Sequence, residues 1–213
     1  MIPRLVAGVM CVSLATIAQA ADEAAVTAPD ASPDRKWSFA LTAYPTDVRG
    51  GENYISAIFA ADRGALHLEA RYDYESIGAR SGYIGWSFAG GDALTWQVTP
   101  IVGGAWGTTK SFIPGVEGSL AWRALDFYVE AEYVPGRARD DSYTYAWSEL
   151  GLRAAPWLRV GLVGQRTRTY GNERDFQRGP FAQVTWGIVT LGAFWFNPGS
   201  SEQVFVGSLG VKF

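Results

Sequence analysis

The sequence predicts an all-β chain that forms a closed antiparallel transmembrane β-barrel of about twelve strands in up-and-down order. Three observations support this: side chains alternate with period two, short and long connections alternate, and aromatic residues collect near strand ends. Of 213 residues, 25 are Gly, 14% are aromatic and 18% are charged. This composition is too apolar for a disordered chain and too poor in Lys and Arg for a nucleic-acid-binding protein. The net charge of −3 gives no general attraction for polyanions.

Residues 1–20 have the three parts of a secretory signal peptide. Arg4 supplies positive charge, residues 5–18 are apolar, and Ala18-Gln19-Ala20 is a small-x-small cleavage site. The apolar stretch is shorter than the roughly 20 residues that span a bilayer as a helix. We expect cleavage here, followed by a flexible leader at residues 21–35. The single Cys lies in the signal, so the mature chain has no thiol for a disulfide or a metal.

Residues 36–213 alternate with period two and form the predicted barrel. In residues 65–75 one face carries apolar and aromatic side chains up to Tyr74, and the other carries His67 and charged side chains up to Glu75. Residues 126–133 repeat this pattern. The predicted strands cover 36–45, 52–62, 65–75, 82–89, 93–105, 111–123, 125–135, 143–154, 157–169, 178–187, 189–197 and 203–213.

The connections and the aromatic residues favour a membrane barrel over a soluble sandwich. Tight turns follow the even-numbered strands, and longer polar loops follow most odd-numbered strands. This asymmetry is typical of an outer-membrane barrel with both termini in the periplasm. Aromatic girdles are predicted near the strand ends, at Trp37, Tyr74, Trp86, Trp122, Tyr133, Trp157, Trp186 and Trp195. Pro100 lies inside a predicted strand, where we expect a bulge or the outer rim.

The final strand alternates through Phe205, Leu209 and Val211 and ends in Phe213. It resembles the terminal signal of outer-membrane β-barrel proteins that the barrel-assembly machinery inserts. By strand count the chain resembles the small twelve-stranded, porin-like barrels of Gram-negative envelopes, which include oligosaccharide porins, nucleoside channels and a phospholipase. No specific motif ties it to one of them. The resemblance implies an integral outer-membrane protein in contact with lipid, lipopolysaccharide and the assembly machinery.

If the apolar rows face lipid, the charged rows face an enclosed lumen. Two alternatives follow: the charges line a narrow aqueous pore that selects solutes, or they pair across strands and plug the barrel. Twelve strands lie between the filled small barrels and the wide porins, so strand number does not decide. The predicted lumen-lining residues are Glu69, Arg71, Asp73, Glu130, Glu132, Glu149, Arg153 and Arg159.

A basic group is predicted at the outer rim, at Arg166, Arg168, Arg174 and Arg178. These side chains could meet lipopolysaccharide phosphates or steer anionic solutes. Alternatively, they belong to a solvated loop in which they pair with neighbouring acids, because exposed ion pairs signify little.

His67 is the only histidine, which limits enzyme chemistry. A Ser-His-acid site for lipids would have to face the membrane, whereas the alternation points His67 inward. We therefore expect no catalytic site, no metal site and no cofactor. The favoured function is a narrow porin-like channel for small polar solutes. The alternatives are a closed structural or binding barrel that presents its outer loops to lipopolysaccharide or a partner and, less favoured, an outer-membrane lipid hydrolase.

Overall fold

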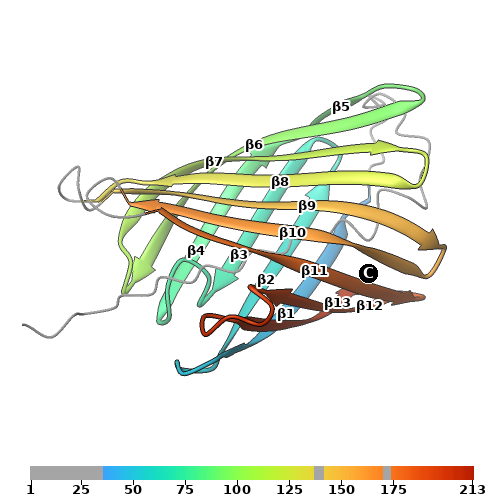
Figure 1. The fold of residues 1–213 in the computed structure, drawn as a ribbon. Helices are drawn as coiled ribbons and strands as arrows, with labels where there is room; N and C mark the ends of the chain where they lie inside the picture. The colour runs from blue at the N-terminus through green and yellow to red at the C-terminus, as the bar shows by residue number, and fades with distance from the viewer. Residues whose placement is uncertain (1–35, 137–141, 170–173) are drawn as a thin grey trace, which may run out of the picture.

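The computed structural model describes residues 36–136, 142–169 and 174–213 and shows an antiparallel barrel (Figure 1). The expected signal peptide at 1–20 and leader at 21–35 lie outside the described residues. Among the described residues, no helix has the length and apolarity of a membrane span. The strands are β1 (Ser38–Val48), β2 (Tyr54–Arg63), β3 (Leu66–Tyr72), β4 (Ala79–Trp86), β5 (Phe88–Gly90), β6 (Leu94–Gly107), β7 (Ser111–Trp122), β8 (Leu125–Val134), β9 (Tyr143–Ala155), β10 (Leu158–Thr169), β11 (Arg174–Trp186), β12 (Val189–Phe196) and β13 (Val204–Lys212).

The sheet closes because its first and last strands pair with each other. β1 pairs with β2 on one side and with β13 on the other, with Leu41 opposite Val211 and Val48 opposite Val204. Neighbours in space are neighbours in sequence around the rest of the barrel. Closure pairs the backbone polar groups between strands, which a membrane-spanning sheet requires. The predicted closed, up-and-down antiparallel barrel is confirmed.

β4 and β5 form one interrupted strand, so the barrel has twelve strands, as predicted. Both pair with β6 in one continuous register, with Gly85 opposite Ile101 and Phe88 opposite Val98. In this register, the residue just before Ser87 lies opposite Pro100 on β6. The Pro100 nitrogen has no hydrogen to donate to the ladder, and the strand is interrupted next to this position, at Ser87. The pairing of β6 with β7 passes Pro100 without a shift, so the bulge expected there is absent from the described register.

The outward face is apolar and would be unstable in water over so large an area. Aliphatic side chains such as Leu150, Leu162 and Leu209 are about half exposed in the middle of their strands. Exposed aromatic residues gather near the ends, where transmembrane barrels carry their girdles. They include Trp37, Trp86, Trp122, Trp157 and Trp186 near the short turns and Tyr72, Trp106, Tyr133 and Trp195 near the opposite end.

The prediction that Tyr74 belongs to the outer girdle is wrong. β3 ends at Tyr72, and Asp73 then adopts a positive φ of 50°, which breaks the alternation. As a result Tyr74 and Glu75 are both buried, at 1% exposure each. Asp73, expected to line the lumen, lies instead in this connection, where its carboxylate accepts a hydrogen bond from the Gly78 amide at 2.8 Å.

Both ends of the barrel chain lie at the end that carries the short turns. The Phe39 amide donates to the Phe213 carbonyl at 2.8 Å, close to the turns after β2 and β11. Those turns contain Gly64 and Gly187, whose φ values of 63° and 59° suit glycine. We call this the inner end and the opposite end the outer end; that the inner end faces the periplasm remains a prediction.

Candidate functional site: the barrel lumen

One group of charged side chains meets inside the barrel around Arg71, and we call it the Arg71 cluster: Arg71, Glu69, Glu130 and Glu132. The Arg71 Nε donates to Glu69 at 2.7 Å, and its Nη1 donates to Glu132 at 2.6 Å and to Glu130 at 3.2 Å. Glu130 and Glu132 are on β8, whereas Arg71 is on β3, and β4, β6 and β7 separate these strands around the wall. The ion pairs therefore cross the lumen.

Two tyrosines complete the surroundings of the Arg71 guanidinium. Its centre lies 4.3 Å from the ring centroid of Tyr74 and 4.2 Å from that of Tyr83, within cation–π range. The Tyr74 hydroxyl also donates to Glu130 at 2.7 Å. The Arg71 side chain has no exposed surface. A buried guanidinium of this kind is stable because carboxylates match its charge.

A second ionic group lies around Arg159 on β10. Arg159 pairs with Asp126 on β8, and its Nη1 donates to Glu149 on β9 at 2.6 Å and to Gln183 on β11 at 2.8 Å. The indole nitrogen of Trp147 donates to the same Glu149 at 3.0 Å. Arg159 thus links four adjacent strands along one wall, in contrast to Arg71, which reaches across.

Aromatic and aliphatic side chains fill much of the remaining interior. The Trp147 ring on β9 lies 5.8 Å from Phe194 and 5.3 Å from Phe196, both on β12. The same buried cluster contains Tyr44 on β1 and Tyr128 on β8, which lie on opposite sides of the barrel. We call these residues the aromatic cluster. Trp147, Phe194 and Phe196 have 0% exposure, so water does not reach them.

This aromatic cluster was not predicted from the sequence. Tyr145 and Trp147 precede the inward-facing Glu149 by four and two residues, and this period-two spacing was the signal that could have placed them inside. Apolar and aromatic residues occupy both faces of this segment in the sequence, so the alternation alone does not show which face is inward.

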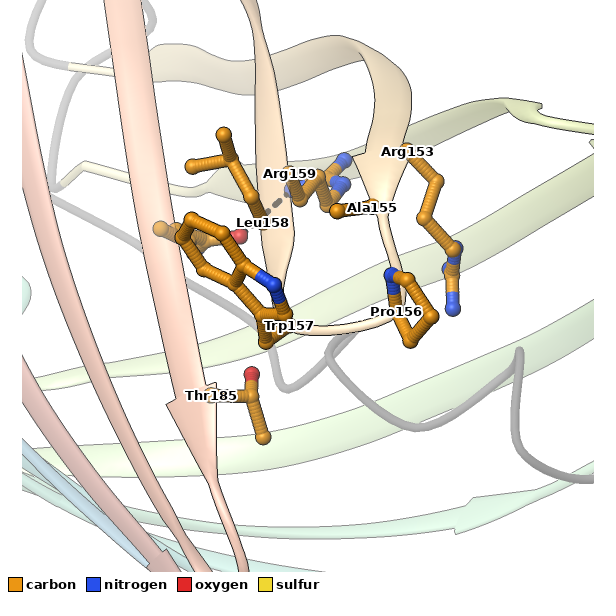
Figure 2. A pocket seen from close by; sticks show the side chains of 8 residues that line it. Arg153, Ala155, Pro156, Trp157, Leu158, Arg159 and Thr185 are labelled. Carbon is orange, nitrogen blue, oxygen red and sulfur yellow. Dashed lines mark hydrogen bonds between the residues drawn. The ribbon is translucent and has the colours of Figure 1, made fainter.

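The inner end of the lumen is more open. Figure 2 shows a small pocket there between β9, β10 and β11, with Arg153 and Arg159 on one side and Trp157 and Thr185 on the other. Arg153 is only half-buried, unlike Arg71 and Arg159. The lumen therefore changes from polar and partly accessible at the inner end to closely packed towards the outer end.

The predicted site residues lie in two places. Of the predicted lumen group, all but Asp73 face the interior, and all but Arg153 and Asp73 are buried. The predicted rim residues Arg166, Arg168 and Arg178 are exposed on the outward face of β10 and β11 near the outer end. Arg174 pairs with Arg168 in the ladder, and its side chain lies outside the described residues.

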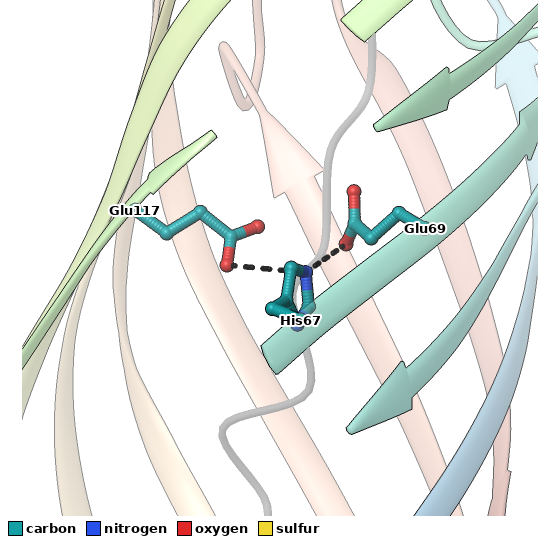
Figure 3. Close-up of side chains that lie close together, drawn as sticks. All are labelled: His67, Glu69 and Glu117. Carbon is teal, nitrogen blue, oxygen red and sulfur yellow. Dashed lines mark ion pairs between the residues drawn. The ribbon is translucent and has the colours of Figure 1, made fainter. Parts of the chain in front are cut away.

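The single histidine lies inside the barrel near the inner end. His67 is 8% exposed, and its Nδ1 is 2.7 Å from Asp62 Oδ1. Its Nε2 lies 3.5 Å from Glu69 and 3.8 Å from Glu117, and the three side chains converge as Figure 3 shows. A lipid hydrolase would need this ring at the outward face, where it does not lie.

Solved structures share this fold. A KdgM porin aligns with a TM-score of 0.55 and 10% identity over 83% of this chain and 98% of that chain. A KdgM porin in complex with disordered oligogalacturonate gives 0.54 and 8%, with coverages of 83% and 98%. A structure from work on the in-meso crystallization of membrane proteins gives 0.59 and 12%, with coverages of 84% and 83%. At these identities the likeness shows the fold alone. No family model and no curated protein matches this sequence.

Proposed function

We propose that the protein is a porin-like outer-membrane barrel of low conductance that passes small polar solutes. The observation that carries the proposal is the meeting of charged side chains from non-neighbouring strands inside a closed barrel with an apolar exterior. Charged rings and constrictions are how pores select solutes. Because the Arg71 cluster and the aromatic cluster are buried, we expect the path to be much narrower than in a barrel with an open lumen.

The charge of the lumen favours neutral and cationic solutes. Acidic side chains outnumber basic ones among the described inward-facing residues. The acids are Asp62, Glu69, Glu75, Glu117, Asp126, Glu130, Glu132 and Glu149, and the bases are Arg71, Arg153, Arg159, Lys212 and His67. Oligogalacturonate, the ligand of one structural neighbour, is acidic. An acid-rich lumen disfavours a polyanion, so the proposed solutes differ in charge from that ligand.

The location and the partners belong to the same proposal. The barrel fold and its apolar belt support an integral outer-membrane position. Arg166, Arg168 and Arg178 lie at the outer end on the outward face, where lipopolysaccharide phosphates would be within reach. We propose that the final strand, which ends at Phe213, is the segment that the barrel-assembly machinery recognises.

Planar-bilayer recording tests the channel. We expect small discrete conductance steps with a preference for cations, and a weaker preference when Glu130 and Glu132 are both changed to Gln. The matched control is Glu202→Gln, an exposed loop acid, which should leave selectivity unchanged. Unchanged selectivity in the double variant would remove Glu130 and Glu132 from the solute path.

A second candidate is a closed barrel that acts through its outer loops. The complete burial of Trp147, Phe194 and Phe196 favours it, because no water reaches the centre of the aromatic cluster. Wild-type conductance discriminates between the two, and Trp147→Ala tests whether the largest fully buried ring closes the lumen. A silent wild type with a conducting variant would support the closed barrel. Silence from well-folded wild type and from the variant would contradict the channel and support the closed barrel. Conductance steps in the wild type would exclude the closed barrel.

A further inference from the structure

We propose that His67, Glu69 and Glu117 form a binding site for a divalent transition-metal cation of the Zn²⁺ type on the wall of the lumen. The sequence pattern predicts no metal site, because these residues lie on β3 and β7 and have only one histidine among them. The fold brings one ligand atom from each to within 4.8 Å of the others (Figure 3). An imidazole nitrogen and carboxylate oxygens are donors that Zn²⁺ accepts.

The distances suit a metal better than direct hydrogen bonds. His67 Nε2 is 3.5 Å from Glu69 Oε1 and 3.8 Å from Glu117 Oε2. Ligands held about 2.1 Å from a tetrahedral ion lie roughly 3.4 Å apart, which is close to these separations. Within the described part of the chain, His67 Nε2 and Glu117 Oε1 are buried and have no hydrogen-bond partner. A buried polar atom without a partner is costly, and a bound cation would satisfy the nitrogen.

A carboxylate holds the histidine ring in the orientation that a metal requires. Asp62 on β2 is the cross-strand partner of His67, and their side chains are in contact at 2.7 Å between Oδ1 and Nδ1. If Nδ1 carries the proton, it donates to Asp62, and Nε2 presents its lone pair to Glu69 and Glu117. A metal-bound histidine almost always donates its other ring N–H to a carboxylate, a backbone carbonyl or water. The contact between Asp62 and His67 Nδ1 does not involve the three converging ligand atoms, so it is a separate observation that supports a metal site.

The other contacts of the two glutamates leave their ligand atoms available. Glu69 Oε2 accepts a hydrogen bond from Arg71 Nε at 2.7 Å. The other carboxylate oxygen, Oε1, is therefore the one that faces His67. Among the described residues, the basic group that lies within ion-pair distance of Glu117 is the imidazole of His67. With a neutral imidazole, the two carboxylates carry two negative charges, which a divalent cation neutralises. Water could complete the coordination from the lumen.

The experiment measures Zn²⁺ binding by the refolded barrel in detergent, with no polyhistidine tag and after removal of metal by a chelator. We expect one Zn²⁺ per chain by isothermal titration calorimetry and much weaker binding of Ca²⁺ and Mg²⁺. His67→Ala should abolish measurable binding, and the isosteric Glu117→Gln should weaken it at least tenfold. Asp62→Asn should weaken it about 10–100-fold. The control is Glu202→Gln, an exposed loop carboxylate outside the lumen, which should bind like wild type.

X-ray absorption of the Zn²⁺-loaded wild type gives a test that needs no variant to fold. We expect one imidazole nitrogen and carboxylate oxygens at about 2.0–2.1 Å. The proposal is overturned if the wild type binds no Zn²⁺, if His67→Ala binds as tightly as wild type, or if the spectrum contains no imidazole. Unchanged affinity in Asp62→Asn would overturn the ring-holding role of Asp62. Binding is measured without ion flow, so its result is independent of whether the barrel conducts.

Discussion

Replacing Arg71 with Met should destabilise the barrel strongly, because it removes a positive charge that three buried carboxylates share. Arg71 donates to Glu69, Glu130 and Glu132 and has no exposed surface. Met keeps much of the side-chain volume, so the change tests the charge more than the packing. Removing one partner of a buried ion pair costs about 3–5 kcal/mol, because the other charge stays buried and uncompensated.

The assay is urea unfolding of the protein in lipid vesicles, followed by tryptophan fluorescence. The matched control is Arg166→Met, which removes an exposed arginine from the outward face and should change the unfolding free energy by within about 0.5 kcal/mol. Arg71→Lys should recover only part of the loss, because an ammonium group lacks the planar fork that reaches several carboxylates. Equal stabilities of the Arg71→Met and Arg166→Met variants would refute the inference that the cluster is an ionic network across the lumen.

Three further predictions address the aromatic cluster, the lipid-facing surface and assembly. Trp147→Ala should lower the unfolding free energy by about 3–5 kcal/mol, because it leaves a cavity in a fully buried cluster; a loss below 1 kcal/mol in the same urea assay would mean that the cluster is not packed. Leu162→Arg places a charge in the middle of the outward face of β10 and should cost about 2–4 kcal/mol in vesicles, whereas a neutral effect would place this face outside the hydrocarbon. Deleting Phe213 should reduce the amount of heat-modifiable barrel in the outer membrane of expressing cells, and an unchanged amount would show that assembly does not use it.

The period-two pattern was sufficient to predict the barrel and the face on which most charged residues lie. On β8, the alternation of Asp126, Tyr128, Glu130 and Glu132 with apolar neighbours placed these four side chains inside, where they are buried. Such a pattern is reliable because a slip of one residue would put every charge into lipid. The break at Ser87 was less predictable, because it depends on the partner strand that carries Pro100.

The pattern failed where backbone geometry or distant packing decides the outcome. Tyr74 continued the apolar row of β3 in the sequence, but the positive φ of Asp73 turns it into the barrel. The bond from Arg71 to Glu132 joins residues 61 positions apart on strands that do not pair. No local pattern encodes which inward residues meet across a lumen, since that depends on closure and register. The same holds for the approach of Glu117 to His67.

The central claim is that one face of each strand meets hydrocarbon while the other faces an enclosed interior. Spin labels on single cysteines along β8 test it directly, because the only native cysteine lies in the expected signal segment. In vesicles, labels at Phe127, Val129 and Ala131 should collide often with oxygen and rarely with a water-soluble nickel chelate. Labels at Tyr128 and Glu130 should show little collision with oxygen, giving a period of two along the strand. Equal oxygen collision at all five positions, or access of nickel to Val129, would contradict the account.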